Sequence, residues 1–107
     1  MASAARLTAE AVAGLSSAPV GVRSPHFTCR GRAGAAPLRL AVVAPKRVWK
    51  LATKRNRVRR RVREAFRVAV SAARAPLRGE ILVSCLAPAA GAPFSVLVGA
   101  AAAAIAV

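Results

Sequence analysis

Three patterns of hydrophobic and polar positions recur along the chain, and each predicts a kind of element. Over residues 53–72, apolar side chains return every three or four positions within a run of charge, which predicts a helix with one buried stripe. Residues 26–30 alternate polar with apolar side chains and predict a strand, while residues 38–44 predict a second, more buried strand. Residues 81–86 form a continuous apolar run between chain breakers and predict a central strand.

Two further helices are expected near the ends of the chain. Residues 8–15 predict a short first helix, with Thr8 as N-cap and with Val12 and Leu15 on one side. Residues 95–107 predict a terminal helix, because alanine has the highest helix propensity. Proline and glycine predict loops or turns at four places, residues 16–25, 31–37, 76–79 and 88–93.

The order of these elements predicts one α/β domain over residues 1–107. A strand, the long helix and a buried strand form a βαβ-like unit, and 107 residues suffice for one small domain but not for two. The last 14 residues are apolar apart from Ser95, but this stretch is shorter than the ~18 residues of a spanning helix. We therefore expect a buried terminal helix.

The net charge of +15 at pH 7 points to the kind of partner. Repulsion of that size opposes compaction, and binding of a polyanion relieves it most directly. An anionic membrane surface is the alternative, but basic membrane helices usually carry Trp, Leu or Phe along the apolar face. Here that face is mostly valine and alanine, which favours nucleic acid.

The charge is concentrated on the long helix. Eleven of the eighteen basic residues lie between Lys46 and Arg67, and Glu64 is the one acid among them. At about 100° per residue, the apolar side chains occupy roughly a third of the helix circumference and the basic ones spread over the rest. The apolar set is Val58, Val62, Ala65, Phe66 and Ala69.

Arginine outnumbers lysine in this segment, and planar guanidinium groups bind phosphate in a bidentate way and stack on bases, which fits RNA. A merely solvated helix face is the alternative, but such faces normally mix charges of both signs. We expect Thr53 or Asn56 to cap the helix and Glu64 to pair with Arg60 or Arg61.

The sequence offers little for catalysis by protein side chains. It has one histidine and no nucleophile beside a base at a recognisable spacing. The acid count also argues against a two-carboxylate metal site. The three acids are far apart along the chain: Glu10, Glu64 and Glu80.

The remaining chemistry-bearing residues have plain structural interpretations. His26 stands alone and is expected in a strand, while Cys29 and Cys85 lack metal-ligand spacing and are expected as buried thiols in a reducing compartment. Trp49 either packs at the core edge or offers a stacking platform for a base. Packing is the favoured interpretation.

The basic segment carries a resemblance to a known family. Residues 52–67 read A-x-x-R-N-R-V-R-R-x-V-R-E-x-F-R, which resembles the RNR helix of the bacterial ribonuclease P protein component. Residues 40–47 resemble the strand with two terminal basic residues that precedes that helix, and residues 80–87 resemble the acid-led strand that follows it. Residues 6–8, with the first helix, resemble the opening of the family.

This resemblance implies a fold and a function. The fold would be an α/β sandwich of about four strands with a left-handed βαβ crossover around the basic helix, ribosomal protein S5 domain 2-like. The protein would be the accessory subunit of an endoribonuclease that removes 5′ leaders from precursor tRNA. It would bind the catalytic RNA subunit, one to one, and the leader. The RNA would hold the Mg²⁺ ions, so no cofactor is expected on protein side chains.

Family motifs also imply site residues. The RNA-contacting residues would be Lys46, Arg47, Arg55, Asn56, Arg57, Arg59, Arg60 and Arg63. The leader cleft would be lined by Val12, Phe27 and Val42.

Neither DNA nor a membrane is expected as a partner, and the expected location is the bacterial cytoplasm. An Ala/Ser-rich start leaves organellar import open. The alternative function is a non-enzymatic RNA-binding protein of the ribosomal or RNA-chaperone type.

Overall fold

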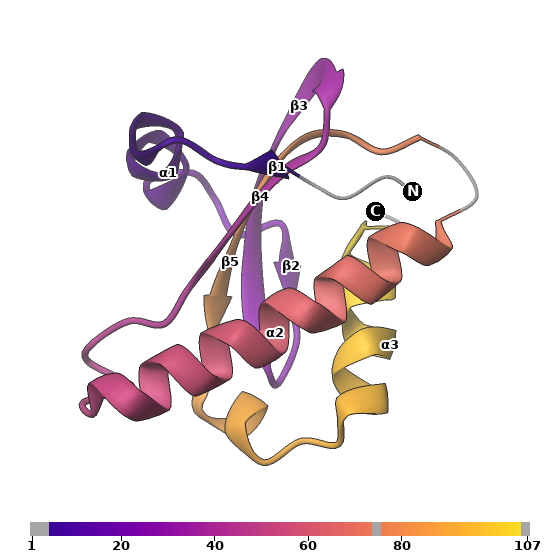
Figure 1. The fold of residues 1–107 in the computed structure, drawn as a ribbon. Helices are drawn as coiled ribbons and strands as arrows, with labels where there is room; N and C mark the ends of the chain where they lie inside the picture. The colour runs from indigo at the N-terminus through magenta and orange to yellow at the C-terminus, as the bar shows by residue number, and fades with distance from the viewer. Residues whose placement is uncertain (1–4, 74–75, 106–107) are drawn as a thin grey trace.

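A mixed β-sheet crossed by one long helix forms the centre of the protein (Figure 1). The structure is a computed structural model, which describes residues 5–73 and 76–105. The strands lie side by side in the order β1-β4-β5-β3-β2. In chain order the elements are β1 (Ala5–Arg6), α1 (Ala9–Ser16), β2 (Val22–Arg23), β3 (Phe27–Pro37), β4 (Arg39–Val43), α2 (Ala52–Ala72), β5 (Arg78–Cys85), the 3₁₀ helix η1 (Ala87–Ala90) and α3 (Phe94–Ile105).

The predicted βαβ unit is present. Strands β4 and β5 are parallel neighbours, and α2 connects them. Strand β3 pairs antiparallel with β5 and β2 antiparallel with β3, while β1 pairs parallel with β4. About four strands were expected, and the sheet has five: the longer strands β3, β4 and β5, and β1 and β2, each two residues long, at its edges. The left-handed sense of the crossover stays a prediction.

Helix α2 is held to the sheet by the apolar stripe that the sequence predicts. The Phe66 ring packs against the Phe27 ring of β3, with centroids 5.2 Å apart and planes tilted by 58°. Leu97, Ala101 and Ala104 of α3 complete the same core. Each large apolar side chain buried contributes roughly 1.5–3 kcal/mol, so this layer is what fixes the basic helix in place. The buried residues of α2 are Val58, Val62, Ala65, Phe66, Ala69 and Val70.

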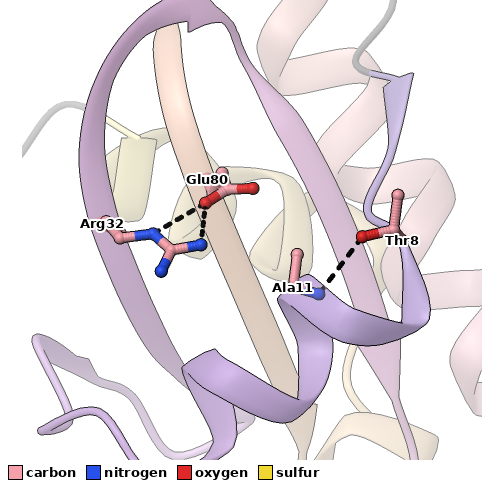
Figure 2. A network of polar contacts seen from close by, with 4 residues as sticks. All are labelled: Thr8, Ala11, Arg32 and Glu80. Atoms are coloured by element: carbon pink, nitrogen blue, oxygen red, sulfur yellow. Dashed lines mark hydrogen bonds and ion pairs between the residues drawn. The ribbon is translucent and has the colours of Figure 1, made fainter.

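Helix α1 lies over the other face of the sheet, where it contacts β3 and β5. Thr8 caps it as predicted, since its Oγ1 accepts a hydrogen bond from the Ala11 amide at 3.2 Å (Figure 2). Leu15 is 1% exposed and anchors the helix. Arg30 of β3 donates from Nε to the Ala18 carbonyl just beyond α1, at 2.8 Å. The first helix and the sheet are therefore fastened by both apolar and polar contacts.

Strand β3 continues through residues 31–37, where the sequence predicts a turn. Its pairing with β5 extends to Arg32 opposite Glu80, and the register then shifts. The two side chains form an ion pair on the sheet (Figure 2). Gly79 has a φ of +99°, and a Cβ there would lie 2.7 Å from the Arg32 carbonyl oxygen. The glycine lets the two strands approach closely, so the chain stays extended instead of turning.

The other strand boundaries also shift from the predicted ones. The predicted loop at residues 16–25 contains β2, and β1 was not predicted at all. Strand β5 begins at Arg78, earlier than the predicted residue 81, because β3 is there to pair with it. The cause is the same in each case: pairing with a neighbouring strand extends the chain where the local sequence has no run of strand-forming residues long enough to predict one.

The helices agree more closely with prediction. Helix α2 begins at Ala52, and Leu51 occupies the N-cap without a side-chain hydrogen bond, so neither Thr53 nor Asn56 caps it. The predicted loop at residues 88–93 contains part of η1. Helix α3 runs from Phe94 to Ile105, and the predicted residues 106–107 lie outside the described part of the chain. Of the helices in that part, none is both long and apolar enough to cross a membrane.

Candidate nucleic-acid interface

The basic residues that the sequence singles out lie on α2 and on the turn that leads into it. In that turn the amides of Val48 and Trp49 both donate to the Pro45 carbonyl, at 3.1 and 2.9 Å. Lys46 and Arg47 project from the turn and are exposed. The other six predicted contact residues follow on α2: the exposed Asn56, Arg57, Arg59 and Arg60, and the half-buried Arg55 and Arg63.

Two arginines of α2 fasten this surface to the rest of the fold. Arg55 donates from Nη1 to the Trp49 carbonyl at 3.2 Å, which ties the helix to its leading turn. Arg61 donates from Nη1 to the Ala89 carbonyl of η1 at 3.0 Å. Hydrogen bonds from a charged donor are stronger than neutral ones. Part of the arginine content thus organises the surface, while exposed side chains such as Arg57 and Arg60 stay available at it.

Glu64 pairs with Arg67, which corrects the expectation of Arg60 or Arg61. Arg67 Nε lies 2.9 Å from Glu64 Oε1, three residues away on the same side of the helix. This hydrogen bond and the charge of Arg67 hold the pKa of the Glu64 carboxyl below its usual range. Within residues 5–73 and 76–105 the Arg60 guanidinium has no acidic partner, so its charge is not offset.

Like charges crowd together where α2 meets the β1 edge of the sheet. Burial lowers the pKa of Arg63, and the neighbouring charges of Arg6 and Arg59 lower it further. Arg6 and Arg63 also line a cavity of about 180 Å³ with an apolar floor that includes Leu40 and Phe66. Guanidinium groups whose charges repel one another, and so lower one another's pKa, are stabilised by an anion bound between them. Glu64 also lines the cavity, but it is paired with Arg67, so the remaining charge of Arg6 and Arg63 suits a phosphate group.

Trp49 packs as the sequence favours. Its side chain is 7% exposed, and Nε1 donates to the Cys85 carbonyl at 3.3 Å. It is therefore not the open stacking platform that the alternative required. Cys29 and Cys85 are buried free thiols, as expected, and burial raises the pKa of each to about 12.

The predicted leader-cleft residues do not lie together. Phe27 is 0% and Val42 4% exposed, and both pack in the core beneath α2, so neither can line an open cleft. Val12 is half-buried on α1, on the other face of the sheet. The expectation was wrong for Phe27 and Val42 because strand alternation tells which residues share a face, but not which face α2 covers.

The face toward α1 holds residues that the sequence did not single out. Alternation from Phe27 places Thr28 and Arg30 on it, and the sheet register brings Ser84 beside Thr28. Val43 lies opposite Ser84 on the next strand. All four are half-buried. The sequence does contain a pattern that could have identified this face. Arginines alternate with small or apolar residues along β3, which indicates that the two faces of the strand differ in their contacts.

Acidic and metal-ligating side chains are dispersed. Within the described ranges 5–73 and 76–105, no three His, Cys, Asp or Glu residues come together as a group that could hold a metal ion. Glu80 pairs with Arg32 and Glu64 with Arg67. The surface offers hydrogen-bond donors and positive charge, which suit phosphate.

Comparisons with known proteins agree with this geometry. Residues 15–106 match the sequence model of the family described as Ribonuclease P. The ribonuclease P protein of Thermotoga maritima has a similar structure, with a TM-score of 0.72 at 20% sequence identity, covering 94% of each chain. That of Staphylococcus aureus matches with a TM-score of 0.65 at 20% identity, covering 94% of this chain and 89% of the other. No curated protein matches in sequence.

Proposed function

The chain belongs to the ribonuclease P protein family, and we propose that it binds the catalytic RNA of that endoribonuclease through the basic face of α2. Members of this family are protein subunits of ribonuclease P, so the chain is an accessory subunit. The observation that carries the proposal is the unbalanced charge of α2: a rigid, core-anchored helix presents arginines among which Glu64 is the one acid.

The chemistry of binding follows from the side chains on that face. Arg57 and Arg60 are exposed and can each reach a phosphate with a planar pair of donors. Asn56 is held by Arg59, whose Nη2 donates to Asn56 Oδ1 at 2.9 Å. The amide is thereby oriented for a base or a sugar. Anchoring the helix before RNA arrives lowers the ordering cost of binding.

The 5′ leader of precursor tRNA is the second proposed ligand. The face of the sheet toward α1 supports this, because Arg30 and Val43 flank polar Thr28 and Ser84 there. With Val12 at the edge, that face mixes hydrogen-bonding groups, apolar contacts and positive charge. Such a mixture suits a single strand that is held without strict sequence preference.

Cleavage itself is assigned to the RNA. Mg²⁺ ions bound by RNA would activate the attacking water and stabilise the leaving oxygen. The protein's own contribution is to hold the catalytic RNA and the leader and to offset phosphate repulsion between them. We propose one protein for each RNA subunit, action in the bacterial cytoplasm, and no role for DNA.

A binding competition tests this function against the ribosomal or chaperone alternative. The chain is titrated with ribonuclease P RNA and, separately, with ribosomal RNA fragments of equal length at the same salt concentration. Tighter binding of ribonuclease P RNA is expected. Equal affinity for both would overturn the specific function and favour general RNA binding.

A further inference from the structure

Strand β3 has an open edge along its second half. On one side it pairs with β5, but on the other side β2 pairs only with Thr28 and Cys29. Residues 31–37 are all exposed, and in the described part of the chain no strand lies beside their outer edge. Figure 1 shows this half of β3 projecting at the top of the view, apart from α2.

The hydrogen bonds of β3 show which of its backbone groups point outward. The Cys29 carbonyl accepts from the Gly21 amide at 2.9 Å. The Phe27 carbonyl accepts from the Ser24 amide at 3.0 Å. Backbone groups alternate between the two sides of an antiparallel strand, so the odd-numbered residues of β3 face the β2 side. Gly31 continues this alternation beyond the end of β2.

The next outward group belongs to Ala33. A Cβ on Gly79 of β5 would lie 2.7 Å from the Arg32 carbonyl oxygen, so this carbonyl points toward β5. The described residues contain no cis peptide bond, and the N–H that follows a carbonyl in a trans peptide points the opposite way. The Ala33 N–H therefore points outward. Pro37, which has no N–H, ends the open edge.

An edge of this kind matches the backbone of another peptide. It presents donors and acceptors in alternation, and an extended peptide satisfies both, whereas a phosphate group would meet the carbonyl oxygens as well as the N–H groups. Apart from Arg32, residues 31–36 are glycine or alanine. Few bulky side chains therefore stand between the edge and an added strand.

Charge near the edge indicates the kind of peptide. Arg23 and Arg32 are exposed and Arg30 is half-buried, while Glu80 of β5 is already paired with Arg32. A second copy of the chain would bring a net charge of +15 against these arginines and be repelled. A segment with acidic side chains would be attracted instead.

We propose that residues 31–36 of β3 take an extended acidic segment of a partner protein as an added strand. The segment would lie beside β3 where β2 ends and would hydrogen-bond to the outward groups of Gly31 and Ala33. This interaction goes beyond RNA binding by α2 and leader binding on the sheet face, and it depends on neither.

Three labelled synthetic peptides test the proposal with the full chain. The probe alternates glutamate with valine, a second peptide replaces glutamate by glutamine, and a third keeps glutamate but has every backbone N–H methylated. The probe should bind more tightly than the glutamine peptide. The methylated peptide should bind about fivefold more weakly for each hydrogen bond lost. Equal affinity of the probe and the methylated peptide would overturn the proposal, because charge alone would then hold the peptide.

A proline substitution on the edge tests the same bonds from the protein side. Ala33→Pro removes the outward N–H and should weaken probe binding about fivefold or more. The matched control is Ala52→Pro, because the first position of a helix such as α2 tolerates proline. A variant with both Arg57→Ala and Arg60→Ala should still bind the probe. If it loses as much affinity as Ala33→Pro does, the peptide lies on α2 and the proposal is wrong.

Amide hydrogen exchange of the unmodified chain needs no folded variant. Exchange of the Gly31 and Ala33 amides should slow when the probe saturates the chain, while the Arg30 and Arg32 amides, which point toward β5, should change little. Unchanged exchange at Gly31 and Ala33 with the probe bound would contradict strand addition. None of these measurements contains RNA, so their failure would leave the proposed RNA binding standing.

Discussion

The Arg61 guanidinium donates a hydrogen bond to the Ala89 carbonyl at 3.0 Å, which joins the basic helix to η1. The finding distinguishes two groups among the arginines of α2. Arg61 and Arg55 each bind a carbonyl of another segment, while Arg57 and Arg60 remain exposed. Stability and RNA affinity should therefore respond differently to single arginine substitutions on one helix.

Arg61→Ala should lower the free energy of unfolding by about 1–2 kcal/mol more than Arg60→Ala does, because only Arg61 holds a buried carbonyl. Both substitutions remove one charge from the same helix, so general electrostatics are matched. Urea denaturation at neutral pH measures the difference. Equal midpoints for the two variants would show that the bond to η1 contributes nothing.

Arg60→Ala should act on RNA binding instead. Its guanidinium is exposed on the charged face, so the variant should bind ribonuclease P RNA more weakly, with a salt slope smaller by about one unit. Binding curves between low and moderate salt measure this slope. Arg23→Ala, which removes an equal charge from β2, serves as the control and should leave the slope nearly unchanged.

Gly79→Ala should destabilise the protein by about 1–3 kcal/mol. The residue has a φ of +99°, and the new Cβ would meet the Arg32 carbonyl oxygen at 2.7 Å. Gly91→Ala is the matched control, because its φ is −105° and nothing lies within 4 Å of the added methyl. Thermal unfolding should therefore separate the two. A Gly79→Ala variant as stable as Gly91→Ala would contradict the close approach of β3 and β5.

The two buried thiols predict a loss of stability in alkali. Burial raises the pKa of Cys29 and Cys85 to about 12 from 9.0, so the folded protein keeps the neutral thiols while the unfolded chain ionises them. Their contribution is complete below about pH 9 and declines as the pH rises toward 12. By pH 10 the loss is of order 1 kcal/mol for each thiol.

Denaturation of Cys29→Ala and Cys85→Ala at pH 7 and pH 10 tests whether the thiols cause the predicted fall in the free energy of unfolding. Each variant should lose less stability than the unmodified chain between the two pH values. Identical losses in all three proteins would show that the thiols are not the groups responsible. The comparison within one pH interval cancels the changes in lysine and arginine charge.

Sequence patterns were sufficient to predict a long helix whose apolar residues recur at regular spacing. The buried positions of α2 follow the predicted spacing of Val58, Val62 and Phe66, and its ends agree within one residue. The Thr8 cap was likewise predictable, since it depends on side chains three residues apart. These features arise from contacts that are local in the chain, or from a periodicity that the fold must respect.

Features decided by distant contacts were not predictable. Strand β1 has two residues and forms only because β4 lies beside it. The extension of β3 depends on Glu80, about fifty positions away along the chain. The partner of Glu64 was missed because arginines lie within reach on both sides of it, and sequence spacing does not choose between them. Phe27 and Val42 are buried in the core beneath α2 instead of lining an open cleft, since alternation does not show which face a helix covers.

Cleavage of precursor tRNA by ribonuclease P RNA at low Mg²⁺ tests the central claim most directly. The rate is measured for the RNA alone, with the chain, and with a variant that carries Arg57→Ala and Arg60→Ala together. The account predicts a clear increase in cleavage with the chain and a smaller one with the double variant. An unchanged rate with folded chain in excess over RNA would contradict it.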